Sequence, residues 1–238
     1  MASPIPEEDT DFRKLNSEGL ANLLEAARVE GVRTVVHLST LDVHGFKAGK
    51  VDERTPPNPA DQYQKSKADA KRVLTEFAKA NDAPRLVVIR AARTVGSRDW
   101  TLAVPLLRMI LNRKVILPQS SETSFVHPKD VAQAMYKAAT NRALSGEVYL
   151  VKSFDADAQS LARQLAASVV GSADFRQSGF RSKPALPRYT VWQLEASLRI
   201  EAQASWYTMG YSPGFDLART CDEIAQWYRK EPWIAEPA

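Results

Sequence analysis

Short apolar runs alternate with helix-like patterns along most of this 238-residue chain. Residues 12–30 place Leu and Ala side chains three and four positions apart and end at Gly31, which predicts a helix with Leu20, Leu23, Leu24 and Ala27 on one stripe. The β-branched run 34–39 predicts a strand buried on both faces, and 86–90 predicts a second. A helix is expected between them, at 61–80.

The alternation continues beyond the second strand. Helices are expected at about 101–114, 130–140 and 158–169, and strands at 115–117 and 147–151. Pro105 fits the first of these helices only in its first turn. Helices that alternate with apolar strands predict βαβ units, so the expected fold class is α/β with a mainly parallel sheet.

Both ends of the chain depart from this alternation. The first residues are rich in Pro and acids, whereas 172–213 is rich in Ser, Arg, Pro and aromatic residues, and its part 175–190 predicts an irregular lobe over a cleft. We therefore expect a leader at 1–11, an α/β domain at 12–170, and a C-terminal lobe with a closing helix at 171–238.

The composition is typical of soluble globular proteins, with 44% hydrophobic and 25% charged residues. The net charge of +4 is too small, and its side chains too scattered, for a nucleic-acid surface. Cys221 is the only cysteine, which excludes an internal disulfide and favours a reducing, cytoplasmic location. No apolar run approaches the length that crosses a bilayer, so we expect neither a membrane nor a nucleic-acid partner.

Several common sites are absent from the sequence. The ten glycines stand at least four positions apart, so there is no G-x-G-x-x-G turn to cradle a dinucleotide pyrophosphate. The three histidines lack metal-ligand spacing, and no metal site is expected. No G-x-S-x-G turn supports a serine hydrolase. His37, inside a strand, is expected to be a core group with its hydrogen bonds satisfied, or a neighbour of a ligand, rather than a ligand itself, and a structural hydrogen bond is expected for His127, before an N-cap at Asp130.

One constellation remains as candidate chemistry. Tyr63 and Lys67 lie four positions apart on a predicted helix, so their side chains share one face. Such a pair alone is common on helix surfaces. Here Ser39 and Thr40 end the preceding buried strand, where open α/β sheets bind ligands. Hydroxyl, phenol and ammonium groups are therefore expected to converge on one cleft.

Five segments occur in the order that they have in one protein family. They are 15–45, 63–67, 87–100, 125–135 and 209–229. Through them the chain resembles the extended short-chain dehydrogenases/reductases, the branch of NAD(P)-dependent epimerases, dehydratases and hydroxysteroid dehydrogenases. The resemblance implies a partial NAD(P)-binding, Rossmann-like parallel sheet followed by a small C-terminal substrate lobe.

The resemblance also implies an activity and its residues. The chain would be an NAD(P)-dependent oxidoreductase or epimerase acting on a hydroxyl or carbonyl group of a small-molecule substrate. Tyr63 would be the general acid/base, because the Lys67 cation would favour the phenolate of a group whose free pKa is about 10. Thr40, with Ser39 beside it, would donate a hydrogen bond to the reacting oxygen.

For the cofactor, the resemblance implies NAD or NADP. Tyr63 and Lys67 would contact the nicotinamide ribose, and the backbone around Thr94 and Val95 would flank the ring. Asn16 matches a helix Asn of the family that is expected to be structural. A homodimer through the helices around the Tyr–Lys pair is among the assemblies that the resemblance implies.

Four positions depart from the family pattern. They are His44 in place of Tyr, Ala91 in place of Pro, Pro128 in place of Val, and Thr123 where nucleotide-sugar members have an Arg for the pyrophosphate. The last change argues against a nucleotide sugar, and residues 183–194 look more like the hydroxysteroid dehydrogenases. Both a nucleotide-sugar and a hydroxysteroid-like substrate stay open.

The family match starts at the helix before the family's fifth strand. The strand at 34–38 would then lack a neighbour, so we expect that the sequence is a truncated form or that another element covers this edge. Without a glycine-rich turn, the alternative function is a non-catalytic remnant of the fold that serves as a binding or scaffold module.

Overall fold

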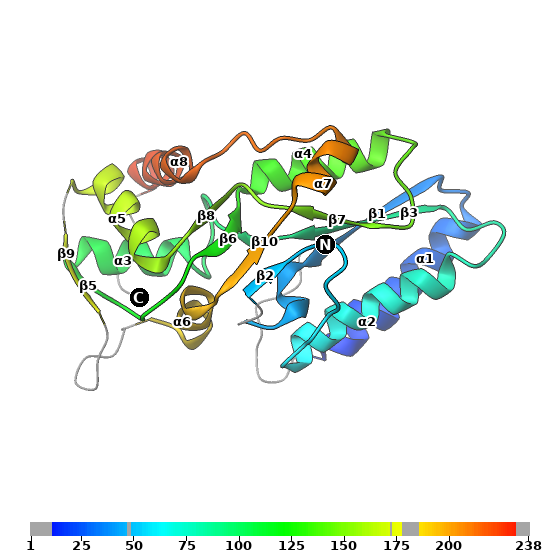
Figure 1. Ribbon diagram of the computed structural model, residues 1–238, viewed down its shortest axis with the longest axis horizontal. Helices are drawn as coiled ribbons and strands as arrows, with labels where there is room; N and C mark the ends of the chain where they lie inside the picture. The colour runs from blue at the N-terminus through cyan, green and yellow to red at the C-terminus, as the bar shows by residue number, and fades with distance from the viewer. Residues whose placement is uncertain (1–10, 47–48, 172, 178–185, 232–238) are drawn as a thin grey trace.

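The computed structural model describes residues 11–46, 49–171, 173–177 and 186–231. Nearly all of the expected leader, and residues 183–185 of the segment likened to hydroxysteroid dehydrogenases, lie outside these ranges. The described chain has the expected fold class, mixed α/β with parallel strand pairs (Figure 1). The domain division at residues 170 and 171 stays a prediction.

The main sheet has three parallel strands in the order β1 (Thr34–Thr40), β3 (Arg85–Ala91) and β7 (Val148–Val151). Each confirms an expected strand to within one residue. In the register of β1 and β3, Thr40 pairs with Ala91, so the carboxyl ends of the two strands meet at one edge of the sheet. Among the described residues, no strand pairs with the other side of β1.

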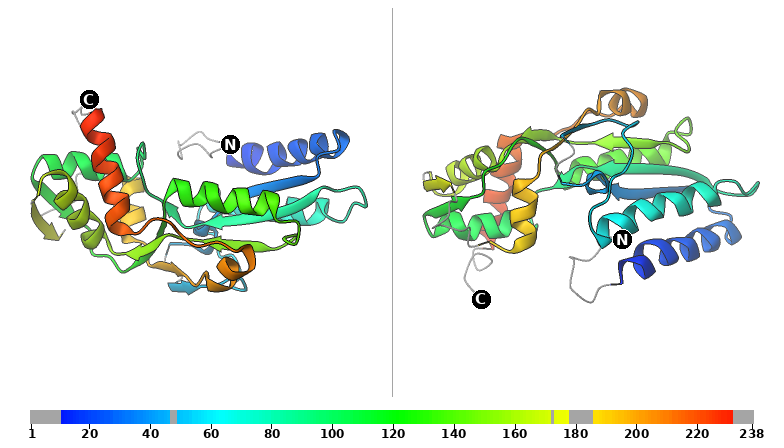
Figure 2. Two further views of the ribbon diagram at one scale, coloured as in Figure 1. Left: turned by 90° about the horizontal axis from the view of Figure 1, so that it is seen from above. Right: turned by 60° about the horizontal axis from the view of Figure 1, so that its bottom comes forward.

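Helices cover both faces of this sheet, and β3, its central strand, is buried as predicted, whereas most residues of the edge strand β1 are only half-buried. The helices are α1 (Gly19–Val29), α2 (Gln62–Phe77) and α4 (Pro128–Thr140). Leu86 and Val88 of β3 pack with α1 and α2, whereas Val87 and Ile89 pack with α4 on the opposite face. Figure 1 and the right view of Figure 2 show this three-layer arrangement, with the sheet between the two helix layers.

The first helix begins with a wider turn than expected. Residues Lys14–Glu18 form a π-helical segment, η1, which continues directly into α1. Leu20 and Leu24 are buried as predicted, but Leu23 is 47% exposed. The placement of Leu23 on the buried stripe is therefore wrong, because the packed face of α1 runs through the leucines that are four positions apart.

The remaining strands form three small sheets. These sheets are β2 (Gly49–Val51) with β10 (Leu198–Ile200), β4 (Arg93–Thr94) with β6 (Thr123–Val126) and β8 (Phe154–Ala156), and β5 (Lys114–Leu117) with β9 (Asp174–Gln177). A second apolar core lies beside them, at the opposite end of Figure 1 from α1. Its helices are α3 (Ala103–Leu111), α5 (Ala158–Val169) and α8 (Leu217–Lys230).

Half of the segment expected to be irregular, residues 178–185 of 175–190, lies outside the described ranges. The expectation is wrong for the described ends of this segment, which belong to β9 and to the helix α6 (Arg188–Glu195). The chain then continues into β10 and the helix α7 (Gln203–Met209). β10 extends the sheet of β2, and α7 packs beside β7. The strands have three or four residues and the helices seven or eight, so none is long enough to show a clear period in the sequence.

Arg85 joins the start of β3 to the end of α4, and its loss has a predictable cost. Its Nη atoms donate at 2.6–3.1 Å to Thr34 Oγ1 and to the carbonyl oxygens of Ala138, Ala139, Asn141 and Leu144. Arg85→Met keeps the apolar stem, removes these donors and is expected to lower the free energy of unfolding by about 2 kcal/mol in urea titrations. The matched change Arg72→Met, at an exposed position of α2, is expected to cost less than about 0.5 kcal/mol. Equal losses in the two variants would contradict this role.

Candidate functional site

The first turn of α2 is held by two reciprocal contacts between side chains and backbone. Asp61 is the N-cap and accepts a hydrogen bond from the Gln64 amide (2.7 Å), while Gln64 Oε1 accepts one from the Ala60 amide (2.7 Å). Such contacts satisfy amide groups that a helix start otherwise leaves unpaired. They fix the turn that carries Tyr63, and Lys67 follows one turn later.

Lys67 is a buried lysine, only 8% exposed. Its Nζ lies 6.0 Å from the centroid of the Tyr63 ring, so the structure brings the predicted pair together. Burial lowers the pKa of Lys67 from its ordinary value, because desolvation disfavours the ammonium form. In the described part of the chain, this ammonium makes no hydrogen bond and no ion pair.

Tyr63 is held by the N-terminal helical segment. Its ring packs edge-on against Phe12, with the centroids 5.5 Å apart and the planes at 71°. Ser66 Oγ donates a hydrogen bond to the Tyr63 carbonyl oxygen (2.7 Å) and accepts one from Asn16 Nδ2 (3.1 Å). Asn16 therefore has the structural role expected of it, through a side chain of the helix that carries Tyr63.

Ser39 and Thr40 lie at the carboxyl end of β1. Ser39 is 5% exposed. Thr40 caps the short 3-10 helix η2 (Leu41–His44), where its Oγ1 accepts a hydrogen bond from the Asp42 amide (3.2 Å). A hydroxyl that accepts in this way keeps its own proton to donate. Because η2 packs against α2, the end of β1 adjoins the Tyr–Lys helix.

Thr94 and Val95 follow β3 at the same end of the sheet. The Thr94 side chain is exposed, whereas Val95 is 1% exposed and belongs to the second core. The Val95 amide already donates to the Val126 carbonyl oxygen (3.0 Å). The exposed Thr94 side chain and the other backbone groups of this turn are left to face a ligand, and the contact of this turn with a nicotinamide ring stays a prediction.

Sequence reasoning missed a buried ion pair next to Thr40. Arg93 Nη2 donates to Asp42 Oδ1 at 2.6 Å, and the two side chains are 2% and 7% exposed. Arg93 Nη1 donates to Thr123 Oγ1 (2.8 Å), which in turn donates to the Leu198 carbonyl oxygen (2.9 Å). Thr123, expected where relatives place a pyrophosphate ligand, is buried and holds Arg93 instead.

A second buried arginine is held by His44. Arg90 Nη1 lies 2.9 Å from His44 Nε2, and His44 Nδ1 lies 3.1 Å from the Pro56 carbonyl oxygen. Nδ1 must therefore carry the proton, while Nε2 accepts from Arg90. Burial lowers the pKa of Arg90 to about 10 and also lowers that of His44. His44, at the position where the resemblance leads one to expect Tyr, is therefore a hydrogen-bond partner of Arg90 inside the protein.

His37 does not have the satisfied environment that its strand position suggests. Its Nε2 is buried without a hydrogen-bond partner, which corrects the expectation of satisfied hydrogen bonds there. Burial, followed by the nearby charges of Lys67 and Lys71, lowers its pKa to about 4. His37 is therefore neutral at physiological pH, so it adds no charge beside Lys67.

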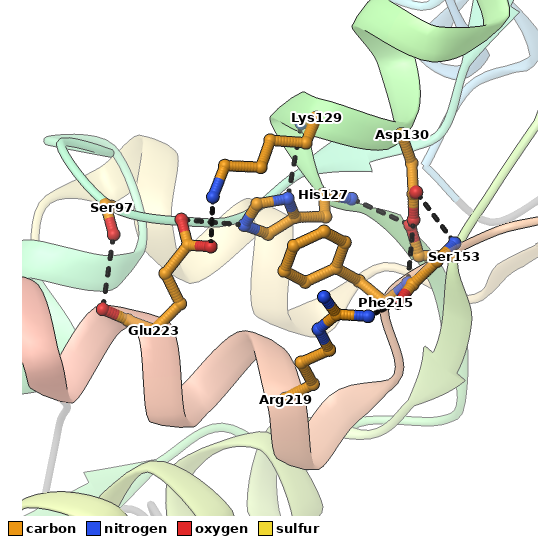
Figure 3. A network of polar contacts seen from close by, with 9 residues as sticks. Ser97, His127, Lys129, Asp130, Ser153, Phe215, Arg219 and Glu223 are labelled. Carbon is orange, nitrogen blue, oxygen red and sulfur yellow. Dashed lines mark hydrogen bonds and ion pairs between the residues drawn. The ribbon is translucent and has the colours of Figure 1, made fainter.

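His127 is the N-cap of α4, and Figure 3 shows the network around it. Its Nδ1 accepts a hydrogen bond from the Lys129 amide (3.2 Å), and Pro128 occupies the first helical position. The structural role expected of His127 is confirmed, but the N-cap predicted at Asp130 is wrong. Asp130 lies in the first turn and accepts hydrogen bonds from the Gly214 and Phe215 amides (2.8 and 3.2 Å).

The chemistry available at the end of β1 is that of a hydroxyl, a phenol and an ammonium group. Cavities of about 990 and 740 Å³ elsewhere in the molecule are not lined by Thr40, Tyr63 or Lys67. Over the described ranges, no three His, Cys, Asp or Glu side chains gather as metal ligands, and no helix is both long and apolar enough to cross a membrane. A lysine that is 8% exposed and whose ammonium makes no hydrogen bond or ion pair in the described chain can donate to the hydroxyls of a ribose, so the residues present fit a nicotinamide nucleotide at this point.

Comparison with curated proteins finds distant enzymes of nucleotide-sugar and lipid-linked sugar metabolism. An epimerase of Escherichia coli O157:H7, N-acetyl-alpha-D-glucosaminyl-diphospho-ditrans,octacis-undecaprenol 4-epimerase, is 28% identical over 141 residues, which are 58% of this chain and 43% of that protein. The dTDP-D-glucose 4,6-dehydratase of Mus musculus is 24% identical over 92% of this chain and 62% of its own length. The chain therefore spans less than two thirds of either relative.

Solved structures with the same fold include cofactor complexes. The UDP-glucuronic acid 4-epimerase of Bacillus cereus in complex with NAD has a TM-score of 0.77 and 20% identity, over 95% of this chain and 72% of that one. RMD from Pseudomonas aeruginosa complexed with NADPH has a TM-score of 0.75 and 18% identity, over 92% and 74%. At these identities the likeness establishes a Rossmann-like fold.

A family model decides the classification. The model described as the NAD dependent epimerase/dehydratase family matches residues 6–151, more than half of the 238 residues. The match includes the end of β1, the Tyr–Lys helix and the turn after β3, and it confirms the resemblance found in the sequence. The chain belongs to the NAD dependent epimerase/dehydratase family.

Proposed function

We propose that the chain is an NAD(P)-dependent oxidoreductase or epimerase that uses Tyr63 as general acid/base on a hydroxyl or carbonyl substrate. The observation that carries the proposal is the Lys67 ammonium, buried 6.0 Å from the Tyr63 ring centroid and without a hydrogen bond or ion pair in the described chain. Burial disfavours this cation, as its lowered pKa shows, and hydroxyl acceptors supplied by a ligand would offset part of that cost.

Each residue has one task in this proposal. Lys67 binds the nicotinamide ribose and electrostatically favours the phenolate of Tyr63. Tyr63 moves the proton at the substrate oxygen, and Thr40 donates the hydrogen bond that steadies charge on that oxygen. Ser39 lines the same strand end. The nicotinamide, when bound, supplies the hydride chemistry.

The substrate is proposed as a hydroxyl-bearing small molecule, either a nucleotide sugar or a hydroxysteroid-like compound. The names of the relatives favour the first, because they are epimerases and dehydratases of sugars linked to diphosphates. The buried positions of Thr123 and Arg93 favour the second, because Arg93 is already paired with Asp42 and is not free for a pyrophosphate. The substrate is expected to be a small molecule in either case.

Titration calorimetry with NAD⁺ and NADP⁺ tests the cofactor half of this proposal. The purified chain is expected to bind one of them with a Kd in the micromolar range, and Lys67→Ala is expected to weaken binding by about tenfold or more, the loss of one charge-assisted contact. Lys65→Ala, at an exposed position of the same helix, is the matched control and is expected to bind normally. Unaltered binding by Lys67→Ala would overturn the assignment.

A second candidate function is a binding or scaffold module with no cofactor. It is favoured by the spacing of the ten glycines, which leaves this sequence without a G-x-G-x-x-G turn for the pyrophosphate. The same calorimetry separates the two functions, because a scaffold module is expected to bind neither dinucleotide at millimolar concentration.

A further inference from the structure

The C-terminal helix is joined to the turn after β4 through one histidine. His127 is 1% exposed, and its ring stacks on Phe215 with centroids 3.7 Å apart and planes at 8°. Its Nδ1 accepts from the Lys129 amide, so Nδ1 carries no proton and Nε2 carries it. Nε2 faces Glu223 Oε1 of α8 at 3.3 Å (Figure 3). The hydrogen bond to Nδ1 therefore selects one neutral tautomer, and Nε2 contacts the Glu223 carboxylate without forming a well-aligned hydrogen bond.

The turn after β4 rests directly on this histidine. A Cβ added at Gly96 would lie 2.7 Å from Pro128 Cδ and 3.3 Å from His127 Nε2, so only glycine allows the backbone to approach so closely. On the other side of the contact, Ser97 Oγ donates to the Glu223 carbonyl oxygen at 3.4 Å. Gly96 and Ser97 are thus held between the start of α4 and α8.

Charges on two elements face the His127 ring. On α4, Lys129 Nζ lies 2.7 Å from Glu223 Oε2, and Asp130 holds the backbone of the turn at Phe215. On α8, Glu223 faces Nε2, and the Arg219 guanidinium lies 4.4 Å from the centroid of the Phe215 ring that stacks on His127. Figure 3 shows Phe215 between the imidazole and Arg219. The ring is therefore enclosed by two cations and two anions.

We propose that His127 is a positioning residue whose neutral form latches α8 onto the turn after β4, and that protonation of the ring opens this latch. A second proton would go to Nδ1, which faces the Lys129 amide, and a donor would then face a donor. The α4 cap would be lost and a charge would be buried, and these two costs outweigh the attraction that the imidazolium gains from Glu223 and, at longer range, Asp130. The latch belongs to the packing of α8, so it does not depend on the proposed cofactor.

The pKa shifts of His127 and Glu223 decide whether the contact between α8 and the turn after β4 weakens or strengthens as the pH falls. Burial lowers the pKa of His127, and its attraction to Glu223 and Asp130 only partly offsets this. A histidine whose pKa is lowered by folding contributes its full stabilisation at pH values above its pKa in the unfolded chain, about 6.5. This stabilisation is lost as the pH falls from there toward its pKa in the folded chain. The pKa of Glu223 is also lowered, by its contacts with Lys129 and His127 in spite of burial, so its contribution is lost at still lower pH.

Cys221 provides a local probe of α8. It is the only cysteine of the chain, lies on α8 and is 0% exposed. The experiment measures the rate at which Cys221 reacts with a dipyridyl disulfide, a reagent that modifies thiols in acid as well. At each pH this rate is divided by the rate for the urea-unfolded chain, which removes the pH dependence of the reagent itself. Between about pH 6.5 and about pH 5.5 the normalised rate is expected to rise by up to tenfold, the limit for one linked proton. Far-UV circular dichroism must stay native over this range.

Two variants decide whether His127 is the group responsible. His127→Gln keeps a donor toward Glu223 but has no titrating ring, so its normalised Cys221 rate is expected to be independent of pH. If it does not fold, His127→Asn keeps an acceptor for the Lys129 amide and is expected to give a faster rate, also independent of pH. His37→Asn is the control and is expected to keep the dependence of the unaltered chain. The proposal is overturned if the normalised Cys221 rate of the unaltered chain does not rise as the pH falls. It is also overturned if this rate rises as much in either His127 variant as in the unaltered chain.

Discussion

Asp42→Ala is expected to lower the free energy of unfolding by about 3–5 kcal/mol, because it leaves a buried guanidinium without its anion. Arg93 is 2% exposed in its side chain, and its one ionic partner in the described chain is Asp42. This guanidinium donates its other hydrogen bond in the described chain to the Thr123 hydroxyl, which is neutral. Urea unfolding followed by circular dichroism measures the change.

Two further variants make this result specific to the buried charge. The double replacement Asp42→Leu/Arg93→Met removes both charges and is expected to recover most of the loss, since apolar pairs often substitute well for buried ion pairs. Asp69→Ala breaks the exposed pair with Arg72 on α2 and is expected to cost about 0–1 kcal/mol. A double variant as unstable as Asp42→Ala alone would refute the electrostatic explanation.

Tyr63→Phe is expected to lower turnover by about 10²–10⁴-fold while leaving NAD(H) binding largely intact. The change removes only the phenolic oxygen, so the edge-on packing against Phe12 is kept. The rate is to be measured as NADH formation with a hydroxyl substrate that the unaltered chain oxidises. Retention of the cofactor is to be checked by the calorimetry proposed above.

A matched change elsewhere provides the control for Tyr63. Tyr207 is 92% exposed on α7, and Tyr207→Phe is expected to leave turnover unchanged. If the rate of Tyr63→Phe stays within about twofold of the unaltered chain, Tyr63 is not the general acid/base, because removal of such a group costs at least 10²-fold. Lys67 would then need another explanation for its burial.

The main sheet could be predicted because each of its elements carries its own signal. The strand at 34–39 is rich in β-branched residues, and the helix that carries Tyr63 and Lys67 is long enough to show its period. The adjacency of Thr40 to this helix followed from a general rule on the carboxyl ends of parallel strands. These residues therefore reached their correct elements from sequence patterns alone.

Other parts of the site depend on contacts that sequence spacing does not reveal. Asp42 and Arg93 are 51 positions apart, and nothing local indicates that they pair. The only available signal was an arginine directly after the two alanines that follow Arg90, at the start of β4. Asp130 is intrinsically the better N-cap, but His127 caps α4. The reason is that Pro128 suits the first helical position, so the helix begins at Pro128, two residues before Asp130.

The pairing of β2 with β10 has a consequence for how the chain reaches its native state. Leu198 lies opposite Gly49, so this short sheet joins residues 149 positions apart. The entropy of closing so large a loop must be overcome before the few hydrogen bonds of three-residue strands can form. β10 is therefore expected to dock last, after β1, β3 and β7 have assembled, and the Thr123–Leu198 contact that supports Arg93 would be completed only in this late step.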